Sequence, residues 1–93
     1  FPWLEDADFK NANVDISKEL LTWLNGIWKR GTWLNGTWLN GIWENGTWNT
    51  GVWEYGIWEN GTWYDGIWKF GVWNDGTWED GTWEDGTWYG GTW

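Results

Sequence analysis

From residue 26 onward, hydrophobic and polar positions recur in blocks of five residues. Glycine occupies position 26 and every fifth position up to 91, and each glycine is followed by Thr, Ile or Val and then by Trp. The other two positions vary, although the residue before the glycine is Asn or Asp in nine of the fourteen blocks. A period this strict indicates a repeat architecture.

The order of residues in a block predicts a short extended segment followed by a turn. A β-branched residue between Gly and Trp favours an extended backbone, in which alternate side chains point to opposite sides. Because five is odd, a straight strand would place successive tryptophans on opposite faces. All tryptophans share one side only if the chain turns once per block, and Asn or Asp before Gly favours such a turn.

Two arrangements satisfy this pattern, a coil with tryptophans on its axis and a meander with hairpin turns at Asn-Gly. Thr50 is poorly suited to the positive φ that such a hairpin requires, and a single-layer meander would leave its tryptophans uncovered. The coil is therefore favoured. In it we expect each glycine to make room for an indole, and each indole N–H to donate to a backbone carbonyl at a corner.

Residues 7–16, ADFKN and ANVDI, resemble two repeats of the pentapeptide-repeat proteins. Ala7 and Ala12 match the small position of that motif, and Phe9 and Val14 match the central apolar position. The later blocks share the period and the small-x-bulky order but depart in residue type. The resemblance implies an all-β fold, a right-handed quadrilateral β-helix with four repeats per coil. Residues 26–93 would then form about 3.4 coils, a stack roughly 16 Å high. The resemblance places the central residue of each repeat in the core: Phe9, Val14, Trp28, Trp33, Trp38, Trp43, Trp48, Trp53, Trp58, Trp63, Trp68, Trp73, Trp78, Trp83 and Trp88.

The segment between these two blocks and the tryptophan repeats breaks the period. Residues 17–26, SKELLTWLNG, begin with a possible Ser cap, contain good helix formers and end in Asn-Gly, which predicts a short helix near 17–24 or a bulge. The chain is thus divided into an N-terminal segment, residues 1–25, and a repeat region, residues 26–93, which together form one domain.

Composition narrows the possible chemistry. The 93 residues include no Cys and no His, so we expect no disulfide, no nucleophile–base pair, no enzymatic activity, and no cofactor or metal site. The net charge of −9 argues against binding to a nucleic-acid backbone, and no apolar run is long enough to span a membrane. The pairs Glu79–Asp80 and Glu84–Asp85 are interpreted as solvated turn residues, or as an acidic surface.

These features favour a non-enzymatic structural or interaction module. An uncapped coil at the C-terminal end, with Tyr89 and Trp93 as possible interface residues, predicts a homo-oligomer, either a dimer or a filament. Similar low-complexity repeats suggest, by resemblance only, a phage or cell-surface assembly. An alternative is an acidic inhibitor that imitates DNA and occupies the basic groove of a DNA-binding enzyme such as a topoisomerase. A carbohydrate-binding module is the second alternative. Read at twenty-residue spacing, Ile and Val interrupt every threonine column, which argues against an ice-binding face.

Overall fold

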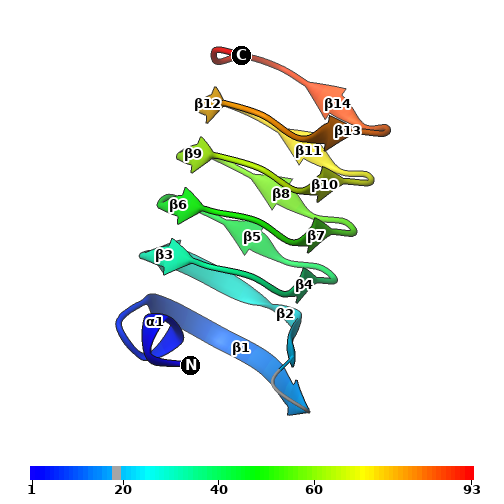
Figure 1. Ribbon diagram of the computed structural model, residues 1–93. Coiled ribbons are helices and arrows are strands. Elements are labelled where there is room, and N and C mark those ends of the chain that lie inside the picture. The colour runs from blue at the N-terminus through cyan, green and yellow to red at the C-terminus, as the bar shows by residue number, and fades with distance from the viewer. Residues whose placement is uncertain (18–19) are drawn as a thin grey trace.

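The computed structural model describes residues 1–17 and 20–93, which form one short helix, two long strands and a series of two-residue strands (Figure 1). Helix α1 (Pro2–Glu5) comes first, followed by the two long strands β1 (Asp8–Ser17) and β2 (Leu20–Arg30). Two-residue strands follow, one in each block: β3 (Thr32–Trp33), β4 (Thr37–Trp38), β5 (Ile42–Trp43), β6 (Thr47–Trp48), β7 (Val52–Trp53), β8 (Ile57–Trp58), β9 (Thr62–Trp63), β10 (Ile67–Trp68), β11 (Val72–Trp73), β12 (Thr77–Trp78), β13 (Thr82–Trp83) and β14 (Thr87–Trp88). Among the described residues, no helix has the length and apolar character needed to cross a membrane.

Parallel pairing between strands fifteen residues apart winds the repeats into a β-solenoid of about 4 turns. Trp48, for example, lies between Trp33 on the coil below and Trp63 on the coil above. Each coil therefore contains three blocks, and the predicted four-sided cross-section is wrong. A three-sided coil turns by about 120° at each corner instead of about 90°, and a glycine with positive φ supplies this sharper bend. The glycines at the corners have φ values from 106° to 135°.

The three sides and three corners are named here by their position along the chain. The first face comprises Thr22–Trp23 of β2 with β4, β7, β10 and β13, and the second comprises Ile27–Trp28 of β2 with β5, β8, β11 and β14. The third face is the sheet of β3, β6, β9 and β12, extended by a bridge from Thr77 to Thr92. The first corner (residues 24–25, 39–40, 54–55, 69–70 and 84–85) joins the first face to the second. The second corner (29–30, 44–45, 59–60, 74–75 and 89–90) leads to the third face, and the third corner (34–35, 49–50, 64–65 and 79–80) leads back to the first.

Tryptophans fill the axis of the solenoid, as the sequence predicts. They form three columns, and within a column the rings stack with centroids 4.7–5.0 Å apart and planes 4–7° from parallel. Successive tryptophans meet edge to face at 5.6–5.9 Å. Both geometries are favourable for aromatic rings, at about 0.5–1.5 kcal/mol per pair beyond burial. Those with no exposed surface are Trp23, Trp28, Trp33, Trp38, Trp43, Trp48, Trp53, Trp58, Trp63, Trp68 and Trp73.

The corner glycines are required mainly by the backbone of the coil beneath. A Cβ at Gly61 would first meet the carbonyl oxygen of Gly46, then the Gly46 nitrogen at 3.0 Å and Trp43 Nε1 at 3.2 Å. We expected each glycine to make room for a neighbouring indole, but at Gly61 the indole is the most distant of the three contacts. The turn prediction for Asn and Asp is supported by hydrogen bonds such as that from the Gly76 N–H to Asp75 Oδ1, 2.8 Å.

Strand β1 closes the base of the solenoid and does not form a coil of its own. It pairs antiparallel with β2, so that Phe9 lies beside Trp28 and Val14 beside Trp23. Val14 packs against the core as predicted. The core position predicted for Phe9 is wrong, because its ring lies against Trp23 and Trp28 at the end of the columns and stays 38% exposed. Val14 is half-buried. The expectation that residues 7–16 form coil repeats is wrong, because the chain runs beneath the first and second faces in the opposite direction.

The helix predicted near residues 17–24 is also absent from the described part of that segment. Ser17 ends β1, residues 20–24 belong to β2, and residues 18–19 lie outside the described residues. Thr22 and Trp23 continue the first face downward, opposite Asp15 and Val14 of β1. Pairing to β1 on one side and to β4 on the other outweighs the helix propensity of this segment. The only helix of the described residues is α1, which contacts β3 at the base of the third face.

Candidate interaction surfaces

The buried indoles cannot serve as a stacking platform for sugars or bases. Eleven of them are fully buried, Trp78 is 7% exposed, and only Trp83 and Trp88, which the sequence placed in the core, are half-buried. No further coil covers these two rings. Sequence reasoning missed Trp23, which is fully buried, and Trp3, which packs edge to face on Trp33 at 5.2 Å and covers the base of its column.

The prediction that each indole N–H donates to a backbone carbonyl is wrong. In the described chain, the Nε1 atoms of the eleven fully buried tryptophans have no hydrogen-bond partner. The nearby carbonyls already accept from the coil above, as Trp33 does from the Asn49 N–H at 2.8 Å. An unsatisfied donor costs about 1–3 kcal/mol, whereas burying an indole of about 200 Å² contributes about 5 kcal/mol. Burial therefore outweighs the lost hydrogen bond.

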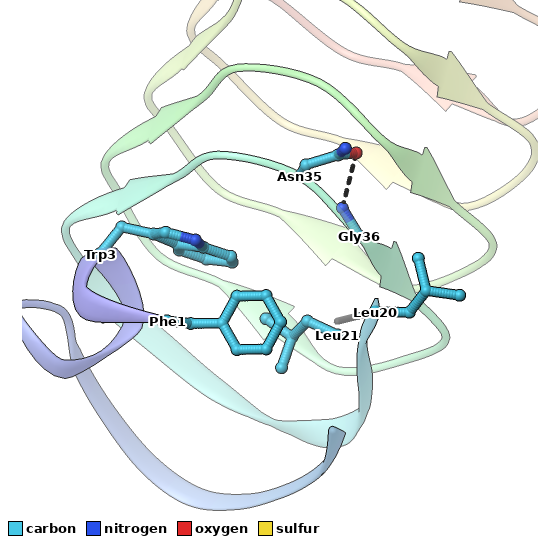
Figure 2. Close-up of a pocket in the computed structure, with 6 residues that line it drawn as sticks. All are labelled: Phe1, Trp3, Leu20, Leu21, Asn35 and Gly36. Atoms are coloured by element: carbon cyan, nitrogen blue, oxygen red, sulfur yellow. Dashed lines mark hydrogen bonds between the residues drawn. The ribbon is translucent and has the colours of Figure 1, made fainter. Parts of the chain in front are cut away.

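A cavity of about 80 Å³ lies at the base, between α1 and the start of β2 (Figure 2). Phe1 and Trp3 face Leu20 and Leu21 across it, and Asn35 with Gly36 forms its upper side. The Asn35 side chain already accepts the Gly36 N–H at 2.8 Å. Ligand pockets usually measure about 300–1,000 Å³, so this small apolar cavity is a packing feature of the base.

The C-terminal coil leaves aromatic surface and backbone acceptors uncovered. Trp93 is 75% exposed and stacks on Trp88 with centroids 4.8 Å apart and planes 27° from parallel, while Tyr89 is 72% exposed. The ladder of inter-coil hydrogen bonds ends with Thr92 N–H donating to Gly76. The carbonyls that continue this series, those of Trp78, Gly81, Trp83, Gly86 and Trp88, accept no such bond among the described residues. This coil is the least covered part of the solenoid.

The acidic residues singled out from the sequence lie at different corners. Glu79 and Asp80 are at the third corner, and Glu84 and Asp85 are at the first. Both aspartates support their turns, because Asp80 Oδ1 accepts from the Gly81 N–H at 2.8 Å and Asp85 Oδ1 accepts from the Gly86 N–H at 2.7 Å. The two glutamates are exposed. Outside residues 18–19, no three potential metal ligands lie together.

The fifteen-residue register brings together outward side chains that the sequence leaves apart. Tyr55 and Phe70, which lie fifteen residues apart in the sequence, stack at the first corner with centroids 5.5 Å apart and planes 12° from parallel. On the third face the outward residues form an unbroken threonine column: Thr32, Thr47, Thr62, Thr77 and Thr92. The expectation that Ile and Val interrupt every threonine column is therefore wrong, because one coil contains fifteen residues and not the twenty on which that expectation was based. The third face thus carries one column of threonine hydroxyls, with larger side chains at the corners on both sides.

Compared with known proteins, the chain matches no family model, no curated protein and no solved structure. The similarity to pentapeptide-repeat proteins consequently stays at the level of a five-residue period wound into a β-solenoid.

Proposed function

We propose that this chain is a non-enzymatic structural and interaction module that self-associates through its C-terminal coil. The observation that carries the proposal is the exposure of Trp93 and Tyr89 above the half-buried rings of Trp83 and Trp88. Indoles and backbone acceptors in this arrangement would gain stacking and hydrogen bonds from another coil.

A closed pair fits this surface better than a filament. The base is covered by α1 and β1, so a head-to-tail contact would have to form on a capped end, whereas two C-terminal coils can meet symmetrically. The end of a solenoid 21 × 19 Å across offers on the order of 300 Å² per copy, well below the roughly 800 Å² of a standard interface. The pair is therefore expected to be weak.

Sedimentation velocity from about 10 µM to about 1 mM tests the proposal. We expect reversible self-association that Trp93→Ser weakens by removing the end-on contact. Ile16→Ser, which also removes an exposed apolar side chain but on β1, should have no effect. Because acidic coils approach each other, raising the salt concentration should strengthen this pair. A strict monomer at the highest concentration would exclude end-on association.

A second candidate is the acidic inhibitor that imitates duplex DNA. Residues 31–93 carry nine acids and one lysine, a net charge of −8. Over about four coils at about 4.8 Å this is roughly one charge per 2.5 Å, against about 1.7 Å for duplex DNA.

Salt-sensitive capture of a type II topoisomerase, weakened by the double substitution Glu79→Gln and Glu84→Gln, would support this second candidate. Because these glutamates hold no turn, the fold should be unaffected, and no capture at low salt would discard the idea.

A further inference from the structure

Apolar side chains of the second face lie next to an exposed aromatic pair of the first corner. The outward residues of that face lie one above another in a column, Ile27, Ile42, Ile57, Val72 and Thr87. Beside this column the stacked rings of Tyr55 and Phe70 are 50% and 47% exposed, and Ile57 is 38% exposed. The third face carries threonine at every equivalent position, so one side of the solenoid is apolar and another is polar.

We propose that the second face is a docking surface for a second copy of this chain, lying side by side and antiparallel. The two-fold axis would pass between the coil of Ile57 and the coil of Val72, perpendicular to the solenoid axis. Apolar surfaces of this kind mark protein contacts, and an isologous contact requires a surface that matches itself after rotation.

The order of residues along the face meets that requirement. The rotation places Ile57 opposite the partner's Val72 and Tyr55 opposite the partner's Phe70. A parallel pair would instead set the aromatic rings against the partner's second corner, where Asn74 Nδ2 donates to Glu59 Oε1 at 2.8 Å. The antiparallel arrangement is favoured because like surfaces then meet.

Charge at the rim of this surface also fits a two-fold axis in that position. Lys69 is the only cation after Arg30 in the sequence, and its Nζ lies 3.9 Å from Glu54 Oε2 of the same chain. Both side chains are partly exposed, at 45% and 39%. In the antiparallel pair, Lys69 lies next to the partner's Glu54 as well as its own, so each copy offers the other an opposite charge.

The available area is larger than that of the coil end. A side of a body 32 Å long and about 20 Å wide covers on the order of 600 Å² per copy. Two such sides approach the lower limit of about 1,200 Å² for specific interfaces, which the coil end does not reach. This contact is therefore expected to be the tighter of the two, and it does not depend on the end-on contact.

A charge-swap experiment in the full chain carrying Trp93→Ser tests the side-by-side pair without end-on association. By sedimentation equilibrium, Glu54→Lys alone and Lys69→Glu alone should each weaken dimerisation about tenfold or more. Mixing the two variants should restore it, since each lysine-bearing copy then faces a glutamate-bearing copy. The salt bridge within one chain cannot produce that rescue, so mixing separates the two roles of these residues.

A matched aromatic pair provides the control. Tyr55→Glu should abolish the side-by-side dimer, whereas Tyr64→Glu, the same change at the similarly exposed third corner, should leave it unchanged. Far-UV circular dichroism checks that each variant stays folded. A monomer in the Trp93→Ser background up to about 1 mM, equal effects of the two tyrosine variants, or no rescue on mixing would overturn the proposal.

Discussion

A tryptophan in the middle of the solenoid and one in its last coil occupy the same place in the repeat, yet their surroundings differ. Trp58 stacks between Trp43 and Trp73 and is fully buried. Trp88 stacks on Trp73 below, has only the tilted ring of Trp93 on its other side, and is half-buried. The stability that a block contributes is therefore set by the coils next to it more than by its own residues, as expected for a linear stack of repeats.

The largest expected contrast between the two regions comes from their glycines. Gly61→Ala should destabilise the fold by about 3 kcal/mol or more, because φ is 126° and the new Cβ would meet the Gly46 carbonyl. Gly90 lies in the last coil outside the repeat position and a Cβ there meets only Asn74 O, at 3.3 Å. Gly90→Ala should therefore change stability by less than about 0.5 kcal/mol. Urea unfolding followed by circular dichroism measures both, and similar values would contradict the role assigned to Gly61.

A smaller contrast is expected between tryptophans. Trp58→Ala should cost about 3–5 kcal/mol, since it opens a cavity between two stacked rings. Trp88→Ala should cost about half as much, because this ring is half-buried and its removal leaves a surface depression. Equal unfolding free energies for the two variants would mean that the last coil is covered in solution, as end-on association requires, so the comparison is made at low protein concentration.

The smallest effects should be equal in both regions. Asn45 and Asp85 each accept the N–H of the following glycine, at 2.9 and 2.7 Å, and this bond joins adjacent residues of one coil. Replacing either by Ala should cost about 0.5–1.5 kcal/mol, measured in moderate salt to screen the charge of Asp85. Asn60, at the same corner as Asn45 but without such a bond among the described residues, provides the control, and Asn60→Ala should be close to neutral. A larger cost at Asn45 than at Asp85 would show that corners also depend on neighbouring coils.

The five-residue period was enough to predict a solenoid with tryptophans inside, because the alternation in Gly-x-Trp fixes which side chains share a face. It could not give the number of blocks per coil, which depends on the angle at each corner and hence on the glycine φ values. The number of blocks per coil decides which outward side chains lie above one another. The threonine column of the third face and the Tyr55–Phe70 stack were therefore missed. The reversed direction of β1 was missed for another reason: Phe9 and Val14 face the core equally well in either direction.

The stacked indole columns have a consequence for spectroscopy. Rings held 4.7–5.0 Å apart in parallel couple electronically, so an excitation absorbed by one migrates among all of them before it is emitted. Water lowers the energy of the excited state of an exposed indole, and Trp93 in the last coil is 75% exposed. We therefore expect the buried rings to pass excitation toward the C-terminal end, so that quenching by acrylamide reports the accessibility of that end more than the burial of the average ring.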